Sequence, residues 1–356
     1  MDKRTLLRWL ARACLVLWTT LFLSACSSAP TVPITSPSTI PTPTLKWKAD
    51  SVTIDTLTWS PNGTLLASGG FDTAVQIWDA TNGNRVTTLN DFHGGIAAIA
   101  WSPNGRFLIT CSNEPQHAVR LWDTTTWQVL SDFKPDPDSL ITSVTWSPDS
   151  QHIAVGLRGV GGLATVGGAL EIWDIITARR LARFPNAQPI ESVVWSPQGT
   201  AIAAGTTLVV AGKLDCGLLL WDVSRGIGTL APPRIFRSGT DGVTNVAWSP
   251  DQKSLVSGSG TEKAIVQIWD VATGTNTVTF HGHTTEITGI AWSPDQNRIA
   301  SSSWDTTVRV WDVTTQRNIV TFTHDDYVNT LVWSPTALRI AAGDHQGRIS
   351  IWDVPK

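Results

Sequence analysis

Histidine and carboxylate residues gather at two places near the end of the chain, where such side chains could hold a metal ion. His281 and His283 flank one glycine, and His324 is followed by Asp325 and Asp326. Their spacing does not match a zinc pattern, and no cysteine joins either group. We therefore expect neither a metal ion nor a cofactor.

Motifs of catalysis are missing from the sequence as well. The stretch 159–168, GVGGLATVGG, is rich in glycine like a phosphate-binding loop, but it contains no Lys-Ser or Lys-Thr and no helix is expected after it. The sequence carries no Ser-His-Asp motif, no paired-acid motif and no nucleotide-binding fingerprint. It therefore predicts no catalytic residue.

Cys26 stands in a context that predicts covalent lipidation. Residues 1–12 carry four basic side chains, and the apolar stretch 13–23 that follows is shorter than the roughly 20 residues of a membrane-spanning helix. The sequence Leu23-Ser24-Ala25-Cys26 resembles the bacterial lipobox. That resemblance implies cleavage before Cys26 and acylation of the cysteine, which would anchor the protein to a membrane on the non-cytoplasmic side of the cell envelope. An uncleaved signal anchor and an ordinary secretory signal are the alternatives.

Residues after the signal divide into a tether and a larger remainder. Ser, Thr, Pro and small aliphatic residues make up almost all of 27–45 and cannot form a core. We therefore expect three parts: a signal peptide at 1–25, a lipidated linker at 26–45, and one domain at 46–356. The net charge of −3 shows no basic footprint for nucleic acid.

Two tryptophan motifs alternate through this remainder. Trp-Ser-Pro occurs at Trp59, Trp101, Trp146, Trp195, Trp248, Trp292 and Trp333. Trp-Asp occurs at Trp78, Trp122, Trp173, Trp221, Trp269, Trp311 and Trp352. Successive Trp-Ser-Pro motifs lie 41 to 53 residues apart, close to the period of about 40–45 residues that is typical of propeller blades.

Each repeat also carries the pattern of short β-strands. A β-branched residue or leucine stands five and two residues before every Trp-Ser-Pro, as in a strand buried on both faces. Ser-Pro and the Asn, Asp or Gly that follow supply a tight turn. The third strand alternates with a period of two, as in Val75-Gln76-Ile77-Trp78, and Gly83 suits a turn that needs positive φ.

The repeats over 46–356 resemble those of the WD40-repeat family. The resemblance implies an all-β fold, a seven-bladed β-propeller whose blades are four-stranded antiparallel sheets. The last blade ends at its third strand, Trp352-Asp353-Val354. Because the family closes its ring with an N-terminal strand, we expect Thr44–Lys48 to complete that blade and to leave no open sheet edge.

Many family members carry a hydrogen-bonded tetrad of His, Ser or Thr, Asp and Trp in each blade, which satisfies the buried indole N–H. Only blade 6 matches the tetrad fully, with His283, Ser301, Asp305 and Trp311. The partial matches are Ser68, Asp72 and Trp78 in blade 1, where Asp50 replaces the histidine, and His324 and Trp352 in blade 7, where Ala342 and Gln346 replace the serine and the aspartate. We expect these residues to be structural.

An arc of aromatic and histidine side chains is the predicted partner-binding surface. The position seven residues before the tryptophan of Trp-Asp holds Phe71 in blade 1, Trp304 in blade 6 and His345 in blade 7. These three blades are consecutive in a closed ring, and Tyr327 stands in the loop that enters blade 7. Exposed aromatic residues are favoured anchors for protein partners. The alternative is that each ring only covers its own turn.

These features together predict a non-catalytic protein-binding scaffold, a monomeric propeller tethered at the cell envelope with one or more unknown protein partners. Its membrane would be the outer membrane or the outer face of the plasma membrane. Two alternatives remain: an enzyme or ligand sensor that uses the central funnel, and an envelope assembly factor.

The lipobox yields a prediction about processing. Cys26→Ala removes the thiol that would carry the lipid, so the variant should accumulate in an unprocessed or soluble form. Mass spectrometry of the N-terminal peptide and membrane fractionation measure both effects. An unmodified N-terminus in the wild-type protein would contradict the predicted localisation.

Overall fold

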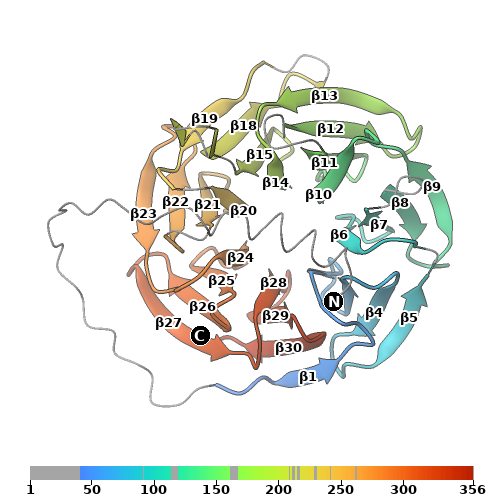
Figure 1. Ribbon diagram of the computed structural model, residues 1–356. Coiled ribbons are helices and arrows are strands. Elements are labelled where there is room, and N and C mark those ends of the chain that lie inside the picture. The colour runs from blue at the N-terminus through green and yellow to red at the C-terminus, as the bar shows by residue number, and fades with distance from the viewer. Residues whose placement is uncertain are drawn as a thin grey trace, which may run out of the picture. The chain divides into compact units, whose positions relative to one another are not determined.

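Seven four-stranded sheets stand around a central axis in the computed structural model (Figure 1). The structure describes residues 41–90, 92–113, 119–160, 167–207, 209–210, 213–214, 217–227, 231–240, 242–260 and 263–355. All seven sheets are antiparallel. The predicted seven-bladed propeller is therefore confirmed. Within the described ranges, no helix is both long and apolar enough to cross a membrane.

Each blade has four strands in the same order from the centre of the ring outward. From blade 1 to blade 7 the innermost strands are β2 (Thr56–Trp59), β6 (Ile96–Trp101), β10 (Ser139–Trp146), β14 (Ile190–Trp195), β20 (Val243–Trp248), β24 (Ile287–Trp292) and β28 (Val328–Trp333). The second strands are β3 (Leu65–Gly69), β7 (Phe107–Ser112), β11 (His152–Gly159), β15 (Ala201–Thr206), β21 (Ser254–Ser259), β25 (Arg298–Ser303) and β29 (Arg339–Asp344).

The third strands carry the Trp-Asp motif. They are β4 (Val75–Asp79), β8 (Val119–Asp123), β12 (Gly168–Asp174), β18 (Gly217–Asp222), β22 (Val266–Asp270), β26 (Thr307–Asp312) and β30 (Arg348–Asp353). The outer strands are β5 (Arg85–Leu89), β9 (Val129–Phe133), β13 (Arg180–Asn186), β19 (Arg234–Arg237), β23 (Asn276–Phe280), β27 (Arg317–Thr323) and, for blade 7, β1 (Leu45–Lys48).

Strand β1 closes the ring as predicted. It pairs antiparallel with β30, with Leu45 opposite Ile351 and Lys48 opposite Arg348. At its start the amide of Thr44 donates to the Ile351 carbonyl over 2.8 Å. The two ends of the described chain therefore share one sheet, and blade 7 exists only when both are in place.

Hydrophobic residues form seven separate clusters, one between each pair of neighbouring blades. A sheet of four short strands has two apolar faces, and both are buried only when a blade stands on either side. The cluster between blades 7 and 1 contains Leu45, Trp47 and Ala49 from the N-terminal segment beside Ile349 and Ile351. Closure therefore completes a core as well as a sheet.

One aromatic pair recurs at every boundary between blades. An aromatic residue on the outer strand of one blade, or just after it, contacts the Trp-Asp tryptophan of the next blade at ring-centroid distances of 5.0 to 6.5 Å. The pairs are Trp47–Trp78, Phe92–Trp122, Phe133–Trp173, Phe184–Trp221, Phe236–Trp269, Phe280–Trp311 and Phe322–Trp352. Such pairs contribute about 0.5–1.5 kcal/mol each beyond the buried area.

The turn after the third strand contains one residue with positive φ. Gly83, Gly226 and Gly274 have φ of 76°, 101° and 75°, and the equivalent residues Trp127, Ala178 and Gln316 have 56°, 53° and 57°. The turn keeps its left-handed residue even where a side chain makes that conformation costly. Strand pairing on both sides of the turn therefore sets its geometry.

The turn after Trp-Ser-Pro also contains one residue with positive φ. Positive φ falls on the residue after the Asn or Asp, as at Gly63 and Gln296, and not on the Asn or Asp itself. Instead, the Asn62 side chain accepts a hydrogen bond of 2.7 Å from the buried hydroxyl of Ser60. The motif serine also accepts from the amide of Leu65, which fixes the start of the second strand.

Two faces of the ring follow from the strand directions. Innermost strands start on the face that carries the turns between second and third strands, here called the upper face. They end in the Trp-Ser-Pro turns on the opposite, lower face. Because β1 runs antiparallel to β30, its Leu45 end lies on the lower face, and residues 41–44 approach the ring from that side.

Ring closure generates a prediction about two deletions. Removing residues 44–50 takes away β1, its cluster residues and the Trp47–Trp78 contact, and exposes the edge of β30. We expect the melting temperature to fall by about 10 °C or more, at about 2–4 °C per kcal/mol. Removing residues 27–40 should cost far less. Equal melting temperatures of the two variants by calorimetry would contradict this role of β1.

Candidate partner-binding surface

The four predicted arc residues lie on the upper face of blades 6, 7 and 1. Phe71, Trp304 and His345 occupy the turns between second and third strands, and Tyr327 lies between β27 and β28. Backbone hydrogen bonds fix two of these turns to the loop that enters the same blade: the amide of Trp304 donates to the Glu286 carbonyl over 3.3 Å, and that of His345 to the Tyr327 carbonyl over 2.9 Å.

Three of the four side chains are open to solvent. Phe71 is 40% exposed, Tyr327 is 53% exposed, and His345 is also exposed. The rings of Tyr327 and His345 contact each other at a centroid distance of 6.4 Å. The structure thus brings Tyr327 and His345 together as one exposed pair on blade 7.

Trp304 is half-buried, and a series of hydrogen bonds that starts at its indole links blades 6, 7 and 1. Its indole Nε1 donates to Asn329 Oδ1 on blade 7 over 3.3 Å, and Asn329 Nδ2 donates to Asp55 Oδ1 on blade 1 over 3.1 Å. The Thr53 hydroxyl donates to the other Asp55 oxygen and accepts from the Phe71 amide. Trp304 therefore supports the arc more than it presents an exposed ring.

Val52 belongs to the same surface, although the sequence analysis did not select it. Its side chain is 72% exposed. Its amide donates to Asp72 Oδ1 in the turn that carries Phe71. On the other side, a Cβ on Gly347 would lie 2.0 Å from the Ser51 carbonyl oxygen, so the turn after His345 packs directly against this loop. An aliphatic residue in a linker has no repeat position, which is why no pattern identified it.

An ion-pair network borders the arc at the outer edge of blade 7. Asp325 accepts from Lys46 over 2.7 Å and from Arg348 over 3.1 Å. The hydrogen bond and the charge of Lys46 lower the pKa of Asp325. Since Lys46 lies on β1, this network joins the closing strand to the loop that presents Tyr327.

The tetrad of blade 6 forms a continuous series of hydrogen bonds. Trp311 Nε1 donates to Ser301 Oγ over 2.8 Å, the Ser301 hydroxyl lies 2.8 Å from His283 Nε2, and His283 Nδ1 lies 2.9 Å from Asp305 Oδ2. The order Ser-His-Asp is that of a hydrolase triad. However, Ser301 is 0% exposed and its oxygen already accepts from an indole, so it cannot reach a substrate.

Protonation states suit this structural role. Burial lowers the pKa of His283, although Asp305 opposes the effect. Burial alone would raise the pKa of Asp305, but hydrogen bonds from His283 and Thr307 outweigh it and lower the pKa to about 2. A neutral His283 then donates from Nδ1 to the carboxylate and accepts on Nε2 from Ser301.

The partial tetrads divide into two kinds. In blade 1, Trp78 Nε1 donates to Ser68 Oγ over 2.8 Å, and Asp50, at the histidine position, pairs with Arg85. In blade 7, His324 Nδ1 lies 3.3 Å from Asp344 Oδ2, which replaces the aspartate missing at 346. With Ala342 in place of serine, His324 Nε2 and Trp352 Nε1 have no hydrogen-bond partner among the described residues.

In blade 3 the indole N–H of the Trp-Asp motif donates to a buried carboxylate that the sequence analysis missed. Val155 occupies the serine position, and Trp173 Nε1 donates instead to Glu171 Oε2 over 3.1 Å. Burial raises the pKa of Glu171, while Arg180, at 2.7 Å from its other oxygen, opposes the effect. An acidic residue two positions before a Trp-Asp motif is the signal that could have identified it.

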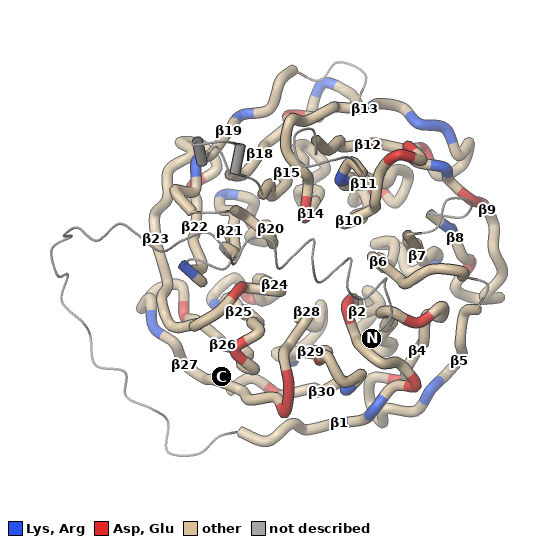
Figure 2. The backbone as a smooth tube through the Cα atoms, viewed as in Figure 1, with Lys and Arg blue, Asp and Glu red and all other residues tan. Residues whose placement is uncertain are grey.

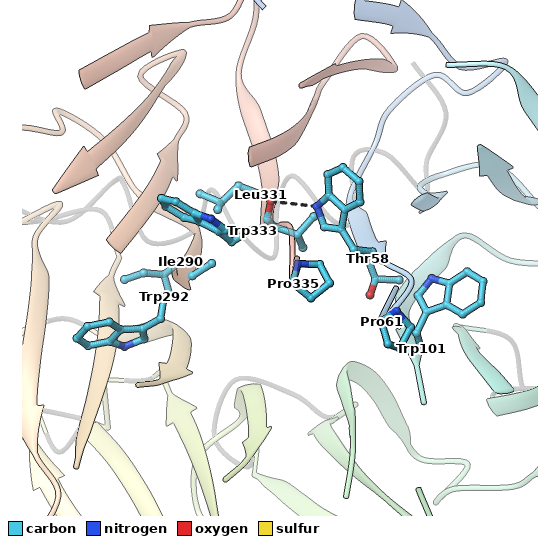
Figure 3. Close-up of a pocket in the computed structure, with 11 residues that line it drawn as sticks. Thr58, Pro61, Trp101, Ile290, Trp292, Leu331, Trp333 and Pro335 are labelled. Atoms are coloured by element: carbon cyan, nitrogen blue, oxygen red, sulfur yellow. Dashed lines mark hydrogen bonds between the residues drawn. The ribbon is translucent and has the colours of Figure 1, made fainter. Parts of the chain in front are cut away.

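The lower end of the central funnel contains a depression without a charged side chain in its lining (Figure 3). The depression there is lined by Thr58, Trp59, Pro61, Trp101, Ile290, Ala291, Trp292, Leu331, Val332, Trp333 and Pro335. None of these side chains titrates near neutral pH. Among the residues that the structure describes, no group of three His, Cys, Asp or Glu side chains is placed to hold a metal ion.

The tetrad generates a prediction about stability. Ser301→Ala leaves two buried groups, Trp311 Nε1 and His283 Nε2, without a partner, and should cost about 2–3 kcal/mol of unfolding free energy. Ser257→Ala in blade 5 is the matched control. It leaves only Trp269 Nε1 without an acceptor, so it should lower the unfolding free energy by about 1 kcal/mol. Denaturant unfolding measures both, and equal losses would contradict a tetrad that acts as one unit.

Comparison with known proteins identifies the same repeats. Residues 231–270, 274–312 and 316–353 match the family model WD domain, G-beta repeat. Residues 44–128 and 118–230 match a second model, eukaryotic translation initiation factor eIF2A. The first model covers β19 to β30, and the second covers β1 to β18.

Curated relatives align over most of the ring at low identity. WD repeat-containing protein srw1 of Schizosaccharomyces pombe is 25% identical over 268 residues, 73% of this chain and 43% of the relative. Protein FIZZY-RELATED 3 of Arabidopsis thaliana is 23% identical over 263 residues, 72% of this chain and 49% of the relative. The chain spans about half the length, or less, of these relatives. The chain is a seven-bladed β-propeller that contains three WD40 repeats over residues 231–353 and matches the eIF2A model over residues 44–230.

Proposed function

We propose that this protein is a non-catalytic platform that binds a protein partner through the upper face of blades 6, 7 and 1. The observation that carries the proposal is the exposed set Val52, Phe71, Tyr327 and His345 on turns that are fixed to the ring. Exposed apolar and aromatic side chains on a rigid support lose little conformational entropy when a partner covers them. That property suits a docking surface.

The direction of β1 relates this surface to the predicted anchor. Residues 41–44 approach the ring on the lower face, whereas the arc lies on the upper face. If Cys26 carries lipid, residues 41–44 connect the lower face of the ring to the part of the chain that carries the anchor. This arrangement supports a scaffold held at the cell envelope, with a partner that approaches from the aqueous side.

A funnel-based enzyme is the weaker candidate. The blade 6 Ser-His-Asp series is buried, and the lower funnel has no titratable side chain in its lining. The surface features of the chain therefore favour binding over a reaction.

The test begins with photo-crosslinking and pull-down of the intact protein from its own membranes, which identifies the partner. Phe71→Ala with Tyr327→Ala should then reduce capture at least 30-fold, since truncation of a hot-spot aromatic costs about 2 kcal/mol or more. Trp304→Phe should reduce capture only modestly, because an aromatic ring is kept at this half-buried position while the hydrogen bond to Asn329 is lost.

Ile176→Ala is the matched control. Ile176 is 82% exposed in a lower-face turn, so its substitution changes exposed apolar area without touching the arc. Undiminished capture by a folded Phe71→Ala, Tyr327→Ala variant, or equal loss in the Ile176→Ala variant, would reject this surface as the binding site.

A further inference from the structure

The upper connections of blades 6, 7 and 1 contain acidic residues and no lysine or arginine. These connections are residues 281–286, 304–306, 324–327, 345–347, 49–55 and 70–74. Their acidic residues are Glu286, Asp305, Asp325, Asp326, Asp50, Asp55 and Asp72. Figure 2 shows acidic residues in red where the chain enters β2 and β28. The upper connections of blades 3 and 5, in contrast, contain Lys134 and Lys263. Negative charge is therefore concentrated on the three blades that carry the exposed aromatic residues.

Basic side chains at the edge of the arc neutralise part of this charge. Asp325 pairs with Lys46 and Arg348. Asp50 pairs with Arg85. The three basic residues lie on strands β1, β30 and β5, outside the upper connections. These ion pairs fix the outer edge of the surface and leave out the carboxylates at its centre.

Two central carboxylates, Asp72 and Asp326, are adjacent in sequence to the exposed rings of the arc. Asp72 Oδ1 accepts a hydrogen bond from the Val52 amide over 3.3 Å. Asp326 accepts from the Tyr327 amide and from Gln346 Nε2, each over 2.7 Å. All these donors are neutral, and among the described residues neither carboxylate has a lysine or arginine as a partner. Each therefore places an uncompensated negative charge beside an apolar side chain.

The exposed apolar side chains and these carboxylates share one continuous surface. The Val52 loop lies between the turn that carries Phe71 and the turn that carries His345. A protein segment that combines an apolar side chain with lysine or arginine matches this arrangement. Its cations would lie near the carboxylates, and a cation close to the Phe71 or Tyr327 ring is also attracted by the ring face. An acidic segment or a nucleic acid would bring like charges together.

We propose that the contact segment of the partner is basic, with an apolar side chain over Val52 and a lysine or arginine near each of Asp72 and Asp326. This inference rests on the proposed function, because it names the partner class of the same surface. Apolar contact holds the partner, while complementary charge selects it and speeds its association. The surface therefore prefers positively charged segments to neutral or acidic segments of equal hydrophobicity.

A library of random peptides displayed on phage tests this preference without the natural partner. The full chain, immobilised through a C-terminal tag, is presented to the library after depletion on a folded Phe71→Ala, Tyr327→Ala variant. We expect the selected peptides to carry a net positive charge and at least one large apolar residue. Selected peptides that are neutral or acidic would overturn the basic-segment proposal and leave the proposed function standing. If no peptide distinguishes the wild type from the variant, the surface itself is rejected and the proposal with it.

Association rates of a selected peptide then test the two carboxylates directly. Asp72→Asn with Asp326→Asn keeps an acceptor oxygen at each position for the Val52 and Tyr327 amides. This double variant should slow association about fivefold in about 50 mM NaCl and less than about twofold in about 500 mM NaCl, because salt screens exposed charges. Calorimetry checks that its melting temperature is unchanged.

Asp138→Asn is the matched control for a general effect of charge. Asp138 is exposed in the upper connection of blade 3, away from the arc. Its substitution removes a negative charge from the same face and should change the association rate less than about twofold. Equal slowing per substitution in the Asp138→Asn variant, or an unchanged rate in the folded Asp72→Asn, Asp326→Asn variant, would overturn the proposal.

Discussion

The fold depends on burial between blades, because no blade has a core of its own. Each four-stranded sheet turns both faces toward neighbours, and the seven hydrophobic clusters all lie at those boundaries. The aromatic pair at each boundary fixes how one blade stands against the next. Six of these pairs use phenylalanine with tryptophan, and the seventh uses Trp47 of β1 with Trp78. Stability is therefore shared around the ring, and the weakest boundary limits it.

The boundary between blades 7 and 1 differs from the others, since it alone unites residues from the two ends of the described chain. β1 is only four residues long, yet it supplies the outer strand of blade 7, part of the adjoining core and Lys46 for the Asp325 network. The same segment leads from the tether into the ring. Residues 41–44 therefore join the ring at its closing strand.

The rigid boundaries between blades also limit which polar groups are available at the surface. Most polar groups inside the blades are committed to tetrads, turns or inter-blade hydrogen bonds, and such groups cannot serve a ligand without loss of stability. The exposed side chains on the upper turns are not committed in this way. Figure 2 shows that Lys and Arg residues and Asp and Glu residues are both distributed around the ring. The proposed partner surface therefore relies on apolar and aromatic side chains more than on net charge.

The blade count and the strand order could be predicted from the sequence, because Trp-Ser-Pro and Trp-Asp each mark the end of a strand. The closing role of Thr44–Lys48 followed because the last repeat lacked an outer strand. It also indicated the blade 6 tetrad residues, whose hydrogen bonds run along a repeat pattern. Other features could be seen only in the folded protein. Trp304 donates a hydrogen bond to Asn329, His324 pairs with Asp344, and Trp173 donates to Glu171 where other blades use a serine or threonine. Val52 is exposed beside the turn that carries Phe71. These features depend on how one blade or loop meets another, and a repeat pattern describes each blade alone.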